Sequence, residues 1–392
     1  MPAMLWLLAL GTFTVGTDAY VMAGILPQVA EDLGVSVSAA GQLVTVFALA
    51  YALLAPLGAS AAARLPGRTV LTGALAVFAF GDVITACAPT YPLALAGRIA
   101  AALGASTLTP QAAVHAGRLV PAEQRAKALS VIVGGITLAT VCGVPLGTAA
   151  GGAFGWRTAP VAVAVLAVCA LVGIRVTFPR EKAAPRSSTP HVPLALLRHR
   201  AVVRVLAISL LTATSEQLVY SYVGPVLEGA TGGDPSSLAL LLLVFGVGAV
   251  AGNALAGHLT DRRDSRMTML ISVSGMTVLF AALPLWSASL PAAAAAMGCW
   301  GATGWMYVTP QQHRLLALTG SDTLGSLAVA LNSSTLYLGI GLGSLIGGSV
   351  LTVAPPAALA WPATALGVTA FVLILLSYGG TKPPSGSAGT LP

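Results

Sequence analysis

Twelve long apolar stretches constrain the fold of this chain more than any other feature of its sequence. Their approximate limits are 4–29, 39–63, 69–89, 92–117, 124–150, 157–178, 201–227, 237–260, 267–288, 291–316, 323–352 and 356–378. Each reaches the roughly 20 residues that an α-helix needs to cross the hydrocarbon core of a bilayer. The stretches are continuously apolar, whereas the strands of a membrane barrel alternate polar and apolar residues. We therefore predict an all-α membrane protein with twelve transmembrane helices.

The few charged residues agree with this topology. Only 8% of the residues are charged, against roughly 25% in soluble domains. With the N-terminus in the cytoplasm, all of the 19 Lys and Arg except Arg98 and Arg157 fall on the cytoplasmic side or at that membrane edge, as the positive-inside rule requires. The predicted outer loops carry acids instead. The net charge of +7 therefore reflects membrane topology, and no folded basic face for a nucleic acid is indicated.

The second half of the chain repeats the first at an offset of 198 to 200 residues. At 198, Asp18 corresponds to Glu216; at 200, Gln111 corresponds to Gln311, each within the same Thr-Pro-Gln triplet. Duplicated membrane chains of this kind are typical of transporters whose site lies between the two halves.

The repeat also predicts the domain organisation. We expect an N-terminal six-helix bundle over 1–178 and a C-terminal six-helix bundle over 201–378. A Pro-rich and basic cytoplasmic linker over 179–200 joins them, and a disordered tail rich in Gly, Pro and Ser covers 379–392. The first stretch lacks a basic leading segment and contains Asp18, so we expect it to be retained rather than removed as a signal peptide. Both termini are then cytoplasmic.

Asp18 and Glu216 each lie about halfway along an apolar stretch. A carboxylate at that depth costs a few kcal/mol or more unless it is paired, protonated or hydrated. Because apolar surroundings favour the neutral form, such a group can take up and release a proton. Both residues are therefore candidates for proton coupling and for substrate binding. The alternative is a structural hydrogen bond to a neighbouring helix.

Asp82 and Arg98 form a second candidate pair. The short turn between the third and fourth stretches places both charges at similar depth, so an ion pair would lower the cost of burying each. Such a pair could serve as a gate or proton relay, or could simply lock two helices together. Neither residue has a charged counterpart in the second half of the chain.

Further polar and aromatic residues within the apolar stretches are candidates for substrate contact. Polar groups there usually face other helices or a hydrated cavity, and hydrogen bonds between helices are at least as common as ligand contacts. These candidates are Gln217, Tyr220, Gln111, Gln311, Asn332 and Trp305. The four cysteines have no paired spacing, and we expect neither a disulfide nor a metal site.

Two glycine ladders have a spacing of four, which places small residues on one helix face and lets helices approach closely. The first includes Gly143 and Gly147, and the second Gly343 and Gly347. Pro145 removes a backbone hydrogen bond within the first ladder and permits a bend. Such faces could let one half rock against the other, or could form a static tight interface.

Clustered charges mark two cytoplasmic loops. Asp261, Arg262 and Arg266 follow the eighth stretch, where they could cap helix ends and hold a closed state. The corresponding loop of the first half keeps Arg64 and Arg68.

These residues together resemble the Major Facilitator Superfamily, specifically the twelve-helix bacterial drug:proton antiporters of the chloramphenicol-resistance and arabinose-exporter-like branch. The similarity covers about 4–378. It is carried by "GTDAYVMAGILPQVAEDLGVSVSAAGQLVTVFAL", by "GVPLGTAAGGAFGWR" at 143–157, which is similar to the antiporter motif, by "ALAGRIAAALGAS" with Arg98, and by the loop sequence "GHLTDRRDSR". The partner loop "ASAAARLPGR" lacks the acid of the family pattern, and Asp82 does not belong to that pattern.

The resemblance implies alternating access, in which two six-helix bundles rock about a central site and proton entry drives export. In that family Arg98 is associated with proton coupling. We expect a monomeric plasma-membrane exporter of small amphipathic compounds, with no cofactor beyond the proton gradient. The alternatives are export of a sugar, nucleoside or other metabolite by the same mechanism and, more distantly, a membrane-embedded enzyme. An enzyme would need a nucleophile–base pair or metal cluster within the stretches, and the sequence indicates none.

Overall fold

The computed structural model describes residues 3–62, 65–178, 194–262, 265–319 and 322–378, and the regular elements within these ranges are all helices. The first half contains α1 (Ala3–Asp32), α2 (Val37–Ala62), α3 (Gly67–Cys87), α4 (Tyr91–Arg118), η1 (Ala122–Gln124), α5 (Arg125–Leu138), η2 (Ala139–Gly143), α6 (Val144–Phe154) and α7 (Thr158–Thr177). The second half contains α8 (Leu194–Arg198), α9 (Arg200–Tyr220), α10 (Val223–Thr231), α11 (Pro235–Arg262), α12 (Ser265–Ala281), α13 (Leu283–Trp286), α14 (Leu290–Met306), α15 (Val308–Thr319), α16 (Asp322–Leu351), η3 (Pro356–Leu359) and α17 (Ala360–Tyr378).

All twelve predicted stretches are helical where they are described, which confirms the all-α fold class. Nine helices of the described residues are long and apolar enough to cross a membrane. The ninth and tenth stretches are each divided, near Pro284 and before Pro310, because proline cannot donate the helical hydrogen bond. The seventh stretch also divides, between Tyr220 and Val223. The count of twelve spans stays a prediction. The predicted tail and most of the linker lie outside the described residues.

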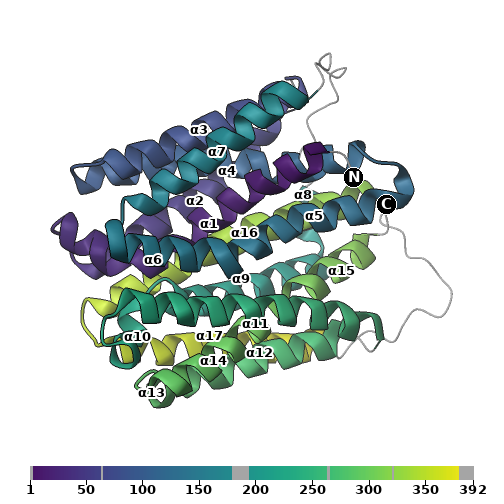
Figure 1. Cartoon of the computed structure of the whole chain (residues 1–392). Helices are drawn as coiled ribbons and strands as arrows, with labels where there is room; N and C mark the ends of the chain where they lie inside the picture. The colour runs from purple at the N-terminus through teal and green to yellow at the C-terminus, as the bar shows by residue number, and fades with distance from the viewer. Residues whose placement is uncertain (1–2, 63–64, 179–193, 263–264, 320–321, 379–392) are drawn as a thin grey trace.

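The helices pack in two groups, one from each half of the sequence (Figure 1). In the first group α1 contacts α2, α4, α5, α6 and α7, while α3 packs against α4 and α7. In the second group α9 packs against α16 and α17, and α14 packs against α11 and α12. The division into two bundles at 179–200 remains our interpretation of these contacts.

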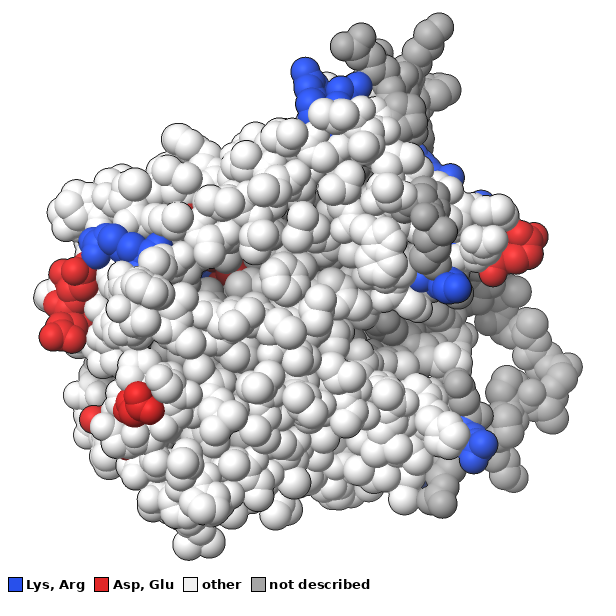
Figure 2. Space-filling model, viewed as in Figure 1, with Lys and Arg blue, Asp and Glu red and all other residues white. Residues whose placement is uncertain are grey.

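The outer surface is apolar, as expected for a protein that faces lipid. In Figure 2 the charged side chains gather near the two ends of the molecule and leave most of the surface between them uncharged. Large apolar side chains are exposed on several helices, among them Phe80 of α3, Leu146 of α6 and Leu376 of α17. In water such a surface would aggregate, whereas in a bilayer lipid tails cover it.

Two seams join the halves: α2 lies along α16, and α11 lies along η2 and α6. Across the first seam the hydroxyl of Ser38 donates to the carbonyl of Gly348 at 2.6 Å, and that of Ser344 donates to the carbonyl of Gly41 at 3.0 Å. At the second seam a Cβ at Gly246 would lie 2.5 Å from the backbone oxygen of Thr140. The second seam thus depends on close backbone approach where η2 forms a π-helical turn, just before Pro145.

The glycine ladders lie within the halves. Added Cβ atoms at Gly143 and Gly147 would meet Thr17 and Val21 of α1. At Gly343 and Gly347 they would meet backbone atoms of Thr214 and Leu218 on α9. Each ladder therefore packs two helices of the same half against each other, and these faces are not part of the seams between the halves. The static interface is the interpretation that the contacts favour.

Candidate functional site

Arg98 lies at the centre of a buried charge cluster in the first half. Its guanidinium Nη1 is 2.5 Å from Oδ1 of Asp18 and 4.0 Å from Oδ1 of Asp82, and all three side chains are fully buried. The guanidinium carbon lies 4.3 Å from the ring centroid of Phe47, and Nε donates to the carbonyl of Leu43 at 3.4 Å. Helices α1, α3 and α4 each supply one charged residue, while α2 supplies the contacts that hold the guanidinium in place.

The pairing in this cluster differs from the one suggested by sequence spacing. The expected partner of Arg98 was Asp82, but the shorter contact is with Asp18. Depth along a helix can be estimated from a sequence, whereas the direction in which a side chain points across the bundle depends on how the helices are packed. Asp18, Asp82 and Arg98 thus form one site. The sequence had suggested two separate features, a buried Asp18 and an Asp82–Arg98 pair.

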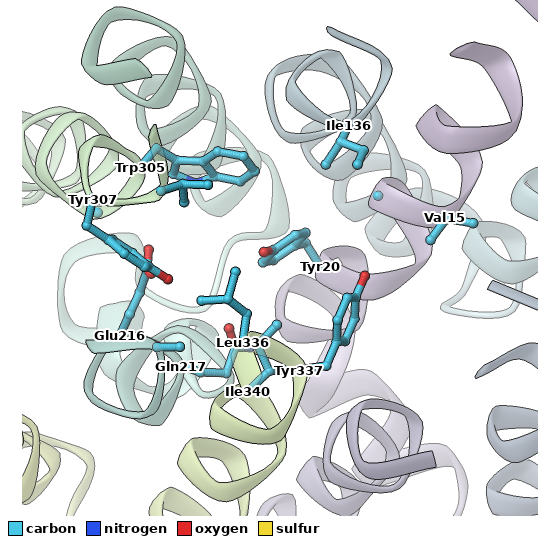
Figure 3. Close-up of a pocket in the computed structure, with 14 residues that line it drawn as sticks. Val15, Tyr20, Ile136, Glu216, Gln217, Trp305, Tyr307, Leu336, Tyr337 and Ile340 are labelled. Atoms are coloured by element: carbon cyan, nitrogen blue, oxygen red, sulfur yellow. The ribbon is translucent and has the colours of Figure 1, made fainter. Parts of the chain in front are cut away.

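Glu216 lies in a central cavity of about 160 Å³ between the two halves (Figure 3). The cavity is lined by Val15, Gly16, Tyr20, Ile136, Ala213, Glu216, Gln217, Gly304, Trp305, Tyr307, Val308, Leu336, Tyr337 and Ile340. Among the described residues Glu216 makes no hydrogen bond or ion pair, and it is the one acidic residue of the lining. A carboxylate without a protein partner is thus held where a ligand could reach it.

Aromatic rings surround the Glu216 carboxylate on several sides. In Figure 3 Tyr307 and Trp305 extend from the second half, and Tyr20 of α1 lies across the cavity from them. The Tyr20 and Trp305 ring centroids are 6.1 Å apart, and Tyr20 also meets Tyr220 edge to face at 5.5 Å. Gly304 leaves room for the carboxylate, because a Cβ there would lie 2.5 Å from Glu216 Oε1.

Three of the proposed substrate contacts line this cavity: Glu216, Gln217 and Trp305. Tyr220 is buried behind Tyr20, so it supports the lining and does not form part of it. Asp18 does not line the cavity either, because it is enclosed in the charge cluster. Of the two acids that were candidates for substrate binding, Glu216 lines this cavity and Asp18 does not.

Gln311, Asn332 and Gln111 also lie outside the cavity lining. The side-chain nitrogen of Gln311 donates to Val205 and Ser209 of α9, both at 3.0 Å, which is the interhelical role weighed as an alternative. Asn332 of α16 is buried, and its side-chain oxygen lacks a hydrogen-bond partner among the described residues. Gln111 is half-buried on α4.

A second cavity, of about 640 Å³, lies between the halves beside the connection of α1 to α2. Its lining includes Glu31, Glu228 and Asp234, which are acids expected in the outer loops. Hydrogen bonds from the side chain and backbone of Ser237, and from the backbone of Ser236, hold the pKa of Asp234 below its usual value. Asp234 therefore stays ionised at neutral pH and caps the first turn of α11.

The cytoplasmic loop charges are described only in part. A guanidinium nitrogen of Arg68 donates to the carbonyl of Arg175 at the end of α7, so it ties α3 to α7 within one half. Arg262 is exposed and Arg266 half-buried. Arg64 and the side chain of Asp261 lie outside the described residues, so the proposed closing role of these loops stays a prediction.

Sequence reasoning did not single out Tyr20 or Tyr337, although both line the cavity. Tyr337 also stacks on Tyr51 of α2, with ring centroids 3.5 Å apart. The available signal was the position of Tyr20 two residues after Asp18, since it places a large polar ring at the depth of the buried acid.

The chain matches the family model described as Major Facilitator Superfamily over residues 8–325, and a second match covers 205–391. It is 32% identical over 345 residues to the inner membrane transport protein YdhP of Escherichia coli, covering 88% of each chain. It is also 34% identical over 282 residues to a chloramphenicol resistance protein of Streptomyces lividans, covering 71% of each.

Solved structures give the same fold. The crystal structure of the nucleoside transporter NupG superimposes with a TM-score of 0.78 at 11% identity, covering 97% of this chain and 100% of that one. At that identity the likeness concerns the arrangement of helices alone.

Proposed function

The chain belongs to the Major Facilitator Superfamily and is a multi-pass membrane transporter, and from this premise we propose that it is a proton-coupled exporter of small amphipathic compounds. Export operates by alternating access: the two halves rock so that the central cavity opens to one side of the membrane and then to the other. The similarity to the chloramphenicol resistance protein of Streptomyces lividans supports drug efflux as the physiological role. The plasma membrane is the proposed location.

The observation that carries the proposal is the lone Glu216 carboxylate in a cavity to which both halves contribute. A carboxylate in apolar surroundings is costly unless a proton or a cation neutralises it. A lipophilic cation could supply that charge, and the rings of Tyr20, Trp305 and Tyr307 would hold it by cation–π and apolar contacts. Proton binding at Glu216 and cation binding then exclude each other, which is the condition for exchange.

The charge cluster of Asp18, Asp82 and Arg98 supports proton coupling in the first half. It is closed to the cavity, and its three charges depend on one another across α1, α3 and α4. A change in its protonation would therefore alter how these helices pack, and α1 also lines the central cavity through Val15, Gly16 and Tyr20. This connection offers a physical route from proton binding to the cavity.

The test measures uptake into inside-out vesicles energised with a proton gradient, using ethidium as a lipophilic cation and chloramphenicol as a neutral probe. Glu216→Gln should weaken ethidium transport roughly 30-fold or more in KM, as expected when one partner of a buried charge pair is removed. Glu31→Gln, an exposed acid of the outer cavity, serves as the matched control and should change little.

If wild-type vesicles accumulate neither probe but do accumulate xylose or uridine, the proposed drug export is wrong and the protein exports a metabolite instead. Equal ethidium transport by the wild type and Glu216→Gln would refute the role of the carboxylate.

A further inference from the structure

Three carboxylate oxygens in the charge cluster have no hydrogen-bond donor. Oδ2 of Asp18 and both side-chain oxygens of Asp82 are buried and unpartnered among the described residues. Buried acceptors without a donor are rare, because each loses its hydrogen bonds to water without compensation. Asp18 and Asp82 interact with each other side chain to side chain, yet two ionised carboxylates have no hydrogen to share.

The charge count of the cluster shows the same deficit. Arg98 contributes one positive charge, while Asp18 and Asp82 together contribute two negative charges if both are ionised. One uncompensated negative charge would then remain at a fully buried position, which carries a large desolvation cost. A single proton removes this charge and at the same time joins two of the three unpartnered oxygens by a hydrogen bond.

We propose that Asp18 and Asp82 bind one proton between them, with Asp82 as the carboxylic acid and Asp18 as the carboxylate that Arg98 holds. The proton adds to an Asp82 oxygen, the O–H then donates to Oδ2 of Asp18, and no other bond changes. The assignment follows the geometry, because Arg98 Nη1 contacts Asp18 at 2.5 Å and Asp82 only at 4.0 Å. With Asp82 protonated, the negative charge of Asp18 balances the positive charge of Arg98, and the buried cluster is neutral as a whole.

The elements packed around Asp82 offer no other charge that could balance it at this depth. Asp82 interacts with Asp18 of α1 and Arg98 of α4. Along their described lengths, α7 carries only Cys169 and Arg175 as titratable residues, and α2 carries only Tyr51. Arg175 lies in the last turn of α7, near the predicted cytoplasmic edge.

This inference rests on the proposed proton coupling and specifies where the first half holds its proton. Loss of that proton would leave α1 and α3 with two adjacent, mutually repelling carboxylates beside Arg98. Proton release is therefore coupled to a change in contact between α1 and the α3–α4 pair. Glu216, in the other half, would carry its own proton or cation independently.

The test uses infrared difference spectroscopy of the purified, lipid-reconstituted protein between neutral and alkaline pH, and needs no substrate. A protonated carboxyl in dry surroundings gives a C=O stretching band that disappears on deprotonation. The Glu216→Gln background removes the cavity carboxyl, while the acids of the described outer loops, such as Glu31 and Asp234, are exposed to water and therefore do not lie in dry surroundings. We expect one remaining band.

Adding Asp82→Asn to that background should abolish the band, and so should adding Asp18→Asn. Either change leaves one carboxylate for one guanidinium, and the proton is no longer needed. Asp82→Glu should keep the band at a shifted frequency, and Asp234→Asn should keep it unchanged. Size-exclusion profiles identify variants that fail to fold. If one of Asp18→Asn and Asp82→Asn fails to fold, the band is measured in the other.

Absence of the band in the Glu216→Gln protein, or its survival in a folded Asn variant, would overturn the shared proton. Because no probe is transported in this experiment, its result is separate from the vesicle assay. The band can be present in a protein that moves neither ethidium nor chloramphenicol, and vesicle transport can succeed without it.

Discussion

The two halves of this protein bury charge in different ways at corresponding positions of their repeat. At Asp18 the first half encloses a carboxylate with Arg98 and a second acid, out of reach of the central cavity. At Glu216 the second half leaves a single carboxylate without a protein partner and directs it into that cavity among aromatic rings. The repeat thus preserves the position of the acid but not its surroundings.

The difference teaches that the halves of a duplicated transporter can divide the work. A closed cluster with two carboxyl groups around one guanidinium suits a small ion such as a proton, because nothing larger can enter it. An open cavity with one unpaired acid suits a ligand that brings its own charge. In the proposed cycle the first half holds a proton in the enclosed cluster, and the second half exchanges a proton for the substrate at Glu216.

The largest expected effect comes from removing the one cation of the enclosed cluster. Arg98→Gln leaves two buried carboxylates without a counter-charge, and we expect it to destabilise the protein by about 3–5 kcal/mol. Thermal unfolding of the detergent-solubilised protein measures this loss. Double-mutant cycles should show stronger coupling of Arg98 to Asp18 than to Asp82, because the Asp18 contact is the shorter one.

The matched control is Arg157→Gln, since Arg157 pairs with Asp32 in an exposed ion pair of the same half. Such pairs contribute at most about 1 kcal/mol. Equal losses for Arg98→Gln and Arg157→Gln would mean that the enclosed cluster is not a distinct feature of the first half.

A smaller effect is expected from a pair of glutamines that the repeat relates. Gln311 of α15 donates two hydrogen bonds to α9, whereas Gln111 of α4 makes no side-chain hydrogen bond with the described residues. Gln311→Ala should therefore cost about 1–3 kcal/mol and Gln111→Ala about 0.5 kcal/mol or less. Unfolding of the two variants in parallel checks this, and a reversed order would show that α15 and α9 are not held together as described.

The smallest effect on stability is expected at Glu216. Glu216→Gln breaks no contact with the described residues and removes a costly charge, so stability should stay within about 0.5 kcal/mol of the wild type or rise. The same unfolding assay measures the stability of Glu216→Gln, and the vesicle assay measures its loss of ethidium transport. A destabilisation comparable to that of Arg98→Gln would instead assign Glu216 a structural partner and end the contrast between the halves.

Much of the architecture could be predicted because it depends on local properties of the chain. Continuous apolar stretches require helices in a bilayer, since backbone groups there must be satisfied within the segment. The depth of Asp18, Asp82, Arg98 and Glu216 followed from their distance to the ends of those stretches. The breaks near Pro284 and before Pro310 were not predicted, although proline marks both in the sequence.

The candidate site was predicted only in part, because its chemistry depends on which helix faces meet. The sequence identified Glu216, Gln217 and Trp305, but it could not show that Tyr20 and Tyr337 complete the lining from other helices. Helices of similar hydropathy can turn about their axes with little change in the sequence pattern, so the direction of a side chain within the bundle is not encoded locally.

The sequence by itself determined that this protein lies in the membrane as a set of helices, and that each half carries a buried acid. The tertiary structure decided what each acid does. It brings Asp18 against Arg98 and Asp82, places Glu216 alone in the cavity, and directs both glycine ladders inward to α1 and α9. The physical reason is that membrane insertion depends on the hydropathy of single segments, whereas charge pairing depends on contacts between segments far apart in the chain.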